Sequence, residues 1–450
     1  MKNFTKFACV MIAVLAVSCQ RDSVAEQHDI SNNNEAQELS YAISEEEALK
    51  NLDRELTCLY GETTRTKERR IRKIEPINSS LLNVHTRSTE IPADDLLYIV
   101  EFEDDNGSAI LGADRRVESV FAILDKGVIS AEDFSNAVNG NNQDKINTYL
   151  AGLIANEAIE QVSTNRAALL PPLIEDLKYG YFVYDTLVNE SRECYLRTKW
   201  EQREPFNDLC YNEDGEKCVA GCVTIAGAQA LLHAYPDPRY ITLEDEIFDK
   251  ELLNMKRYGV TVPANMQASV DHEVARYVYK FATLTNTDLQ PNSSAGYLTY
   301  VASLFNELEG FESAEYCNIC DTTFTKVVRD QLYIDGLPTI MHGVATGHIW
   351  GHAWAIDAYK HLLVNTYLYT KQGNVLISKE LFSTENLKKV HCNFGWGGTC
   401  DGYYTFDIFD LTDFISSEDL IQEIGDNYGA YLSDSYIYDN PISIVKYSLE

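Results

Sequence analysis

The chain has 450 residues, which is enough for two or three domains with a sizeable hydrophobic core. Its 37 basic and 69 acidic side chains give a formal net charge of −32 at pH 7. Because nucleic acids and anionic membrane surfaces repel such a chain, neither is expected as its main partner.

The N-terminal segment is typical of an exported protein. Lys2 and Lys6 precede an apolar stretch over residues 7–17, which is too short to remain in a bilayer as a transmembrane helix. A small residue and then Cys19 follow, as a lipoprotein signal peptidase requires. We expect a signal peptide over residues 1–18 and a lipid on Cys19, with ordinary signal cleavage as the alternative. The lipid would be the only contact with a membrane, at the outer membrane, the cell surface or in the periplasm of a Gram-negative bacterium, unless processing releases the protein.

The next features divide the chain into segments. Residues 19–40 are polar and predict a flexible tether. Over residues 41–165, a helix that Ser44 can cap, two strands around a DDNG turn and further helical periodicity predict a small α+β module. Two prolines in LLPPLIED fall within residues 166–190, which we interpret as a linker or activation region. Residues 191–450 are rich in aromatic residues, glycine and cysteine and contain all four tryptophans.

Cys222 lies at the start of a predicted helix. Gly221 ends the loop before it, residues 223–234 are good helix formers, and Pro236 closes the segment. At a helix N-terminus, unpaired backbone N–H groups favour a thiolate over a thiol, which is what a cysteine nucleophile needs. Cys218 lies in the loop and lacks this help, so we expect Cys222 to be the nucleophile.

A base for this thiol is predicted in the segment IMHGVATGHIWGHAWAIDAYK. The candidates are His342, His348 and His352. His352 begins the alternating stretch HAWAIDAY, which predicts a strand, and Gly351 before it allows close approach to a cleft. His348 lies in a glycine-rich loop, where its position is less fixed. We therefore expect His352 to be the general base.

Further side chains complete a constellation. Asn393 could orient the imidazole, and Trp396, between glycines, could shield that hydrogen bond from water. Gln202, upstream, could form an oxyanion hole together with the backbone N–H of Cys222. Each feature alone is more often structural, but the order Gln, Cys, His, Asn, Trp is that of papain-type cysteine peptidases.

The segments that carry these residues resemble one family. TKWEQREPFND, AGCVTIAGAQALLHAYPDP, GHAWAIDAY and HCNFGWGGTCDGYY are similar to the four signature blocks of the streptopain-like cysteine peptidases, family C10, and occur in the same order. This resemblance implies a papain-like α+β fold, with a helical part and an antiparallel sheet or barrel part over residues 191–450. It also implies that the module over residues 41–165 is an inhibitory prodomain.

The resemblance implies an activity as well. The functional residues of the family fall on Gln202, Cys222, His352, Asn393 and Trp396. We expect an endopeptidase made as a zymogen, with its own prodomain as inhibitor and proteins or peptides as substrates. The family resemblance suggests a bulky apolar side chain two residues before the cut, and no cofactor or metal. In the implied mechanism His352 takes the Cys222 proton, the thiolate attacks the peptide carbonyl, and water hydrolyses the resulting thioester.

The chain departs from the family pattern at several points. Thr224 and Ile225 follow the nucleophile where small, alanine-rich residues are expected, and Ala358 replaces a glycine. Residues 360–390 lengthen the interval between the histidine and asparagine blocks, which predicts an inserted or extended hairpin near the site. These differences bear on specificity and activation more than on the chemistry.

Other interpretations stay open. A zinc ion could be held by four thiolates, those of Cys218, Cys222, Cys317 and Cys320. Export favours disulfides instead, and the expected pairs are Cys210–Cys218, Cys317–Cys320 and Cys392–Cys400. The alternatives for function are a catalytically degenerate or binding protein on the same fold and a Cys–His amidase or transglutaminase.

Overall fold

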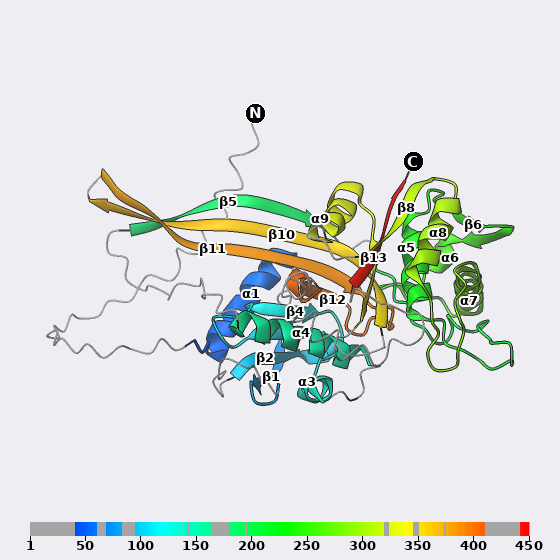
Figure 1. Cartoon of the computed structure of the whole chain (residues 1–450), viewed down its shortest axis with the longest axis horizontal. Helices are drawn as coiled ribbons and strands as arrows, with labels where there is room; N and C mark the ends of the chain where they lie inside the picture. The colour runs from blue at the N-terminus through cyan, green and yellow to red at the C-terminus, as the bar shows by residue number, and fades with distance from the viewer. Residues whose placement is uncertain are drawn as a thin grey trace, which may run out of the picture. The chain divides into compact units, whose positions relative to one another are not determined.

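The structure, a computed structural model, describes residues 41–60, 69–82, 95–139, 141, 145–163, 180–193, 196–318, 324–344, 351–372, 375–409 and 442–449. These residues form a mixed α+β structure built on one large antiparallel sheet (Figure 1). No helix among them is long and apolar enough to cross a membrane. The predicted signal peptide, Cys19 and the tether lie outside this part of the chain.

Residues 41–163 form a small α+β unit, called the N-terminal module below. Ser44 caps the first helix, because its hydroxyl accepts the backbone N–H of Glu47 at 3.2 Å. The elements are α1 (Glu45–Tyr60), β1 (Ile71–Asn78), β2 (Asp95–Phe102), the 3-10 helix η1 (Glu103–Asp105), β3 (Ser108–Gly112), β4 (Val120–Leu124), α3 (Ala131–Val138) and α4 (Ile146–Ser163). The helix after Ser44 and the strands around the DDNG turn are confirmed.

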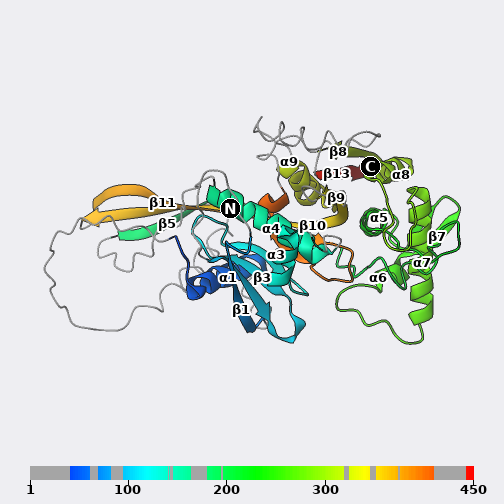
Figure 2. The same cartoon turned by 60° about the horizontal axis from the view of Figure 1, so that its bottom comes forward.

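The helical part of the peptidase segment surrounds α5 (Cys222–Ala234), which begins at the residue that the sequence predicts. Nearly all residues of α5 are buried, and the helix lies between the sheet and α7 (Figure 2). The other elements are the hairpin β6 (Tyr240–Leu243) and β7 (Glu246–Asp249) and the helices α6 (Lys250–Asn254), α7 (Gln267–Leu284) and α8 (Leu298–Glu307).

The sheet part carries the strand that begins at His352. Its elements are β8 (Phe311–Asn318), α9 (Phe324–Arg329), the π-helix η2 (Asp330–Asp335), β9 (Thr339–Val344), β10 (Gly351–Gln372), β11 (Val375–Asn393), β12 (Gly402–Thr405), the 3-10 helix η3 (Phe406–Phe409) and β13 (Ile442–Leu449). A helical part that holds Cys222 therefore packs on an antiparallel sheet that holds His352, which is the papain-like arrangement expected.

The sheet does not end at the N-terminal module. Its strand order is β1-β2-β3-β4-β12-β11-β10-β9-β13-β8, so β4 of the module pairs with β12 of the peptidase segment. This pairing is antiparallel and joins Leu124 to Gly402 and Ile123 to Tyr403. The backbone N–H of Asp125 adds a bond to the carbonyl of Asp401 at 2.7 Å. One sheet of eleven strands thus continues from the module into the peptidase segment.

The main hydrophobic core also spans the N-terminal module and the peptidase segment. One core combines module side chains such as Phe121 and Leu150 with Trp354, Phe394 and Tyr404 of the peptidase segment. A second core fills the helical part around α5 and includes Trp200 and Phe281. A third lies between α1 and the other face of the module's sheet. The module therefore shares its main core with the strands that follow His352.

The predicted insertion is a long hairpin formed by β10 and β11 (Figure 1). The strand β5 (Gly180–Arg192) adds a third strand to it, in register from Gly180 opposite Thr370 to Arg192 opposite Tyr359. Glu190 of β5 also forms an ion pair with Arg329, with N–O distances of 2.5 and 2.6 Å. The second half of the predicted linker, residues 166–190, is therefore a paired strand, and its first half lies outside the described residues.

Candidate active site

Cys222 is the first residue of α5, and the residue before it explains why the helix begins there. Gly221 has φ +90°, and a side chain at this position would come within 3.2 Å of Ser294. Its carbonyl accepts the first helical hydrogen bond, from the N–H of Ile225 at 3.1 Å. Glycine is required at such a position because other residues strain at positive φ. The half-buried Cys222 is thus fixed at the helix N-terminus.

The electrostatics of Cys222 differ from the sequence expectation. Burial raises the pKa of its thiol, although the backbone N–H groups of Ala353 and Val223 act in the opposite direction. The cost of removing a thiolate from water is therefore larger here than the stabilisation that the helix N-terminus gives it. The sequence reveals the position of the thiol on its helix but not how far the surrounding residues bury it. In this structure Cys222 is a neutral thiol.

His352 lies at the start of β10, opposite Gly343 of β9. Its Nε2 is 3.0 Å from the carbonyl oxygen of Phe394 and 3.3 Å from Nε1 of Trp396. The indole N–H of Trp396 can donate to Nε2 only when that nitrogen carries no proton. When Nε2 is protonated, it donates to the Phe394 carbonyl instead and leaves Nδ1 as the basic nitrogen. Burial lowers the pKa of His352 to about 4, and the Phe394 carbonyl opposes that shift. The imidazole is therefore neutral at pH 7.

The structure does not join the two central residues by a hydrogen bond. Among the described residues, none is formed between the Cys222 thiol and His352. The backbone N–H of Ala353, the residue after His352, nevertheless acts on the Cys222 sulfur. The start of β10 and the start of α5 thus face one another. The thiol and the imidazole are both neutral, and they form no hydrogen bond with each other.

Asn393 is buried, and its side-chain amide does not contact His352. Its Oδ1 accepts from Nε2 of Gln229 at 3.3 Å and from the N–H of Gly395 at 3.2 Å. Its Nδ2 donates to the carbonyl of Thr198 at 2.8 Å. The group that meets the imidazole is the backbone carbonyl of the next residue, Phe394.

Trp396 and Gln202 lie on two segments that run side by side. Trp396 is 37 % exposed and forms a β-bridge with Glu201. The carbonyl of Gln202 accepts the N–H of Ala220, two residues before Cys222, at 2.9 Å. The segment around Gln202 therefore connects the loop before the nucleophile with the tryptophan loop. This brings all five residues of the predicted constellation into one region.

The part of the chain that holds these residues matches one family of peptidases. The sequence profile of the Peptidase C10 family matches residues 200–404, which contain all five residues of the constellation. Residues 200–404 form a Peptidase C10 domain. The resemblance to the streptopain-like peptidases is confirmed there, and the chain is a cysteine peptidase.

Solved structures of similar proteins come from Prevotella intermedia. A cysteine-to-alanine mutant of a prointerpain A fragment is 19% identical, with 79% of this chain and 96% of that chain covered and a TM-score of 0.46. The active wild-type interpain A cysteine protease is 19% identical, with 57% and 94% covered and a TM-score of 0.35. No curated protein sequence matches the chain with significant similarity.

The unusual residues after the nucleophile of the C10 domain are directed inward. The hydroxyl of Thr224 lies 2.9 Å from that of Thr287. Ile225 is fully buried against the turn at Gly395, where a Cβ would come within 2.8 Å of its side chain. Both residues therefore pack beneath the site and do not narrow it.

Two of the three disulfide predictions for the C10 domain, Cys210–Cys218 and Cys392–Cys400, are wrong in this structure; Cys317–Cys320 stays a prediction, because Cys320 lies outside the described residues. Cys210, Cys218, Cys392 and Cys400 are free thiols, and so is Cys317; Cys320 and Cys194 lie outside the described residues. The Cys218 thiol contacts the carbonyl of Glu216 at 3.2 Å, and that of Cys400 contacts Oδ1 of Asn147 at 3.3 Å. Nearness in sequence suggested these pairs, but the sulfurs of Cys218 and Cys400 have other partners. Among the described residues, no group of three or more side chains could hold a metal ion.

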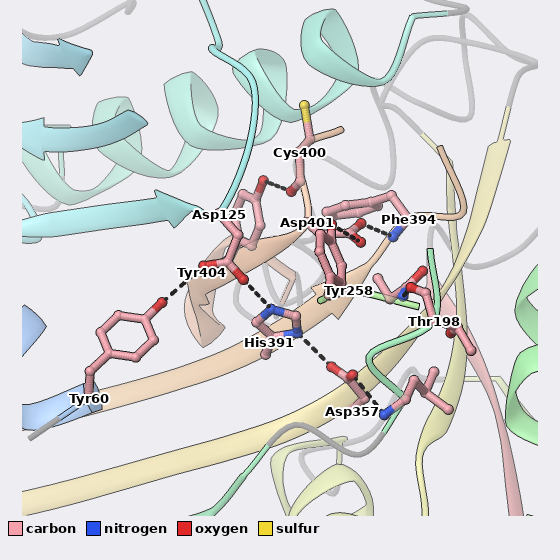
Figure 3. A network of polar contacts seen from close by, with 12 residues as sticks. Tyr60, Asp125, Thr198, Tyr258, Asp357, His391, Phe394, Cys400, Asp401 and Tyr404 are labelled. Carbon is pink, nitrogen blue, oxygen red and sulfur yellow. Dashed lines mark hydrogen bonds and ion pairs between the residues drawn. The ribbon is translucent and has the colours of Figure 1, made fainter. Parts of the chain in front are cut away.

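Sequence reasoning missed a polar network at the junction of the N-terminal module and the C10 domain (Figure 3). His391 of β11 contacts Asp357 of β10 at 2.6 Å through Nδ1 and Asp125 of the module at 3.2 Å through Nε2. Arg69 also pairs with Asp125 at 2.8 Å. Burial alone would raise the pKa of Asp125, but His391, Arg69 and Tyr60 lower it to about 2.

Lys389 forms a second ionic contact with the module. It is 1% exposed and lies 3.2 Å from Glu55 and 3.5 Å from Glu118. Burial raises the pKa of both carboxyl groups, that of Glu118 to about 7, whereas Lys389 lowers it. Lys389 and His391 are two residues apart on β11 and therefore share a face. Alternating cations on this strand are the only sequence signal, and it does not identify their partners.

Asp401 anchors the tryptophan loop of the C10 domain and was also missed. It is 1% exposed, and its side chain accepts the N–H of Phe394 at 2.8 Å and the hydroxyl of Tyr258 at 3.1 Å (Figure 3). Burial raises its pKa to about 7, against the Phe394 N–H and the charge of His391. The peptide plane whose carbonyl meets His352 is thus held next to the Asp401 contact.

Proposed function

We propose that this cysteine peptidase is an exported endopeptidase made as a zymogen, in which Cys222 is the nucleophile and His352 the general base. The observation that carries the proposal is that the start of α5, with Cys222, faces the start of β10, with His352, within a Peptidase C10 domain. This placement puts a thiol and an imidazole on facing elements, and covalent catalysis at a peptide bond requires the two groups to come together.

The reaction follows from these positions. With Nε2–H donated to the Phe394 carbonyl, Nδ1 of His352 accepts the proton of Cys222. The thiolate attacks the peptide carbonyl, and the side chain of Gln202 and the N–H of Cys222 stabilise the oxyanion. The imidazolium then protonates the leaving amine, and water hydrolyses the thioester. Trp396 shields the bond between the imidazole and the carbonyl.

The N-terminal module would keep the enzyme latent. Two features support this: the neutral, unengaged thiol and imidazole, and the continuous sheet from β4 into β12. The activating cut would lie before Gly180, because β5 is hydrogen-bonded along β10 and would stay with the enzyme. The proposal also includes export and a lipid on Cys19. The substrates would be proteins or peptides that carry a bulky apolar side chain two residues before the cut.

Two variants test this function. We expect Cys222→Ala to lower casein cleavage by about 10⁴-fold or more and to abolish labelling by an epoxide thiol inhibitor. His352→Ala should lose cleavage but keep Cys222 available to a neutral alkylating reagent at high pH. Full labelling of Cys222→Ala would disprove the assignment of the nucleophile. Release of ammonia without new amino termini would show an amidase instead, and binding of casein without turnover would show a degenerate peptidase.

A further inference from the structure

A glutamine is buried in the otherwise mostly apolar helix that carries the nucleophile. Gln229 is 0% exposed, and it lies seven residues after Cys222. Residues seven apart in an α-helix lie on the same face, so Gln229 is two turns below the thiol. A buried primary amide is costly unless both of its polar atoms are paired. The buried amide of Gln229 therefore calls for a role that offsets this cost.

Both polar atoms of Gln229 are used in a closed ring of hydrogen bonds. The hydroxyl of Thr198 donates to its Oε1 at 2.5 Å, and its Nε2 donates to Oδ1 of Asn393 at 3.3 Å. Nδ2 of Asn393 donates to the carbonyl of Thr198 at 2.8 Å and closes the ring. Thr198 and Asn393 are each 2% exposed. The orientation of each amide is fixed, because turning Asn393 would set its NH₂ group against the donors of Gln229 and Gly395.

The ring extends to the imidazole through one turn. Oδ1 of Asn393 also accepts the N–H of Gly395 at 3.2 Å, and this N–H belongs to the same peptide plane as the carbonyl of Phe394. The carbonyl of Phe394 is the group 3.0 Å from Nε2 of His352. Gln229 itself touches neither His352 nor Cys222. Its contact with Asn393 therefore acts on the position of the Phe394 carbonyl, and through it on the imidazole.

We propose that Gln229 is a positioning residue of the peptidase: through Asn393 it holds the Phe394 carbonyl where that carbonyl orients His352 toward Cys222. Asn393 then connects α5, through Gln229, to the turn at Phe394 and Gly395. The nucleophile and the acceptor that orients the base are tied to one another by the same helix. This inference rests on the proposed function, because it assigns roles within the Cys222–His352 pair.

A second buried glutamine supplies a matched control. Gln331 is also 0% exposed, donates to the carbonyl of Pro338 at 2.8 Å and accepts the N–H of Tyr447 at 3.3 Å. Neither partner contacts Cys222 or His352. Gln229→Met and Gln331→Met thus remove the same amide from equally buried positions, so a purely structural role predicts the same effect for both.

The test uses the full chain after proteolytic maturation and measures peptide hydrolysis from pH 5 to 10. For Gln229→Met we expect kcat to fall by about 100-fold with KM within about threefold, because misplaced groups slow the chemical step. The hydrogen bond to Phe394 favours the imidazolium, so its loss should move the alkaline limb of the pH–rate profile to lower pH. Gln331→Met should keep kcat within about threefold and the same profile.

The outcomes separate this inference from the proposed function. If wild type has no Cys222-dependent hydrolysis, the proposed function fails; if wild type is active and the two methionine variants have the same kcat and pH profile, the role of Gln229 is overturned. Should Gln229→Met not fold, Thr198→Val decides, because it removes only the hydroxyl that donates to Gln229. We expect about a tenfold lower kcat and the same direction of pH shift. A wild-type profile in Thr198→Val would overturn the proposal.

Discussion

Two buried polar clusters hold this protein together, and they differ in charge. Thr198, Gln229 and Asn393 connect the helix of the nucleophile to the turn beside the base, and all of their hydrogen bonds are between neutral groups. Lys389 and His391 connect β11 to carboxylates of the N-terminal module. The first cluster lies within the C10 domain, and the second lies at the junction between that domain and the N-terminal module.

The difference has a physical consequence. Neutral hydrogen bonds keep their strength over a wide pH range, whereas buried ion pairs depend on the protonation of each partner. A buried ion pair is also strongly destabilised when one partner is removed, because the other charge remains without solvent. In the zymogen that we propose, the contacts that persist during catalysis would therefore be neutral, and the contacts released on activation would be charged.

The largest expected effect comes from Lys389→Met. This change leaves Glu55 and Glu118 buried without their cation, and we expect the free energy of unfolding of the uncut chain to fall by about 3–5 kcal/mol at pH 8. Urea denaturation measures the loss, and faster alkylation of Cys222 in the uncut chain measures the loosening of the module.

The exposed ion pair between Lys73 and Glu75, at 2.6 Å on β1, supplies the control. Lys73→Met should leave both the stability and the alkylation rate unchanged, because exposed pairs contribute little. Equal behaviour of Lys389→Met and Lys73→Met would show that charge does not hold the module to the peptidase.

Asp125→Asn is expected to have an intermediate effect with a defined pH dependence. A pKa of about 2 instead of 3.8 corresponds to about 2 kcal/mol of stability at pH 7. Because the folded-state pKa is lowered, this contribution is complete above about pH 4 and is lost as the pH falls through 2. The free energy of unfolding should therefore decline less between pH 5 and 3 in Asp125→Asn than in wild type. The exposed Asp104→Asn should follow wild type, and a parallel decline in all three proteins would refute the role of Asp125.

The contacts of the charged cluster could not be predicted from the sequence. Asp125 and His391 are 266 residues apart, and only the pairing of β4 with β12 brings them together. Strand pairing between distant segments depends on the whole fold, and neither hydrophobic periodicity nor residue spacing predicts it.

Features set by local chemistry were predictable. The helix start at Cys222 follows from Gly221 and the helix formers after it, and the strand at His352 follows from alternation. What the sequence could not reveal was the local solvent exposure and the identity of the acceptor on His352. Desolvation depends on everything packed around a group, so the direction of the pKa shift of Cys222 required the structure. The acceptor is a backbone carbonyl, which has no signature in the sequence.

The smallest expected effect tests the neutral side of the comparison. Thr224→Val removes the hydroxyl that lies 2.9 Å from Thr287 but keeps the shape of the side chain, so we expect a loss of about 1 kcal/mol in the free energy of unfolding. Thr224→Ser keeps the hydroxyl and separates that loss from packing. Because no ionisable group takes part, the difference between Thr224→Val and wild type should be the same at pH 5 and pH 8. A loss that changes with pH would mean that the region beneath Cys222 is coupled to the charges at the junction, and the division into a neutral and a charged cluster would then not hold.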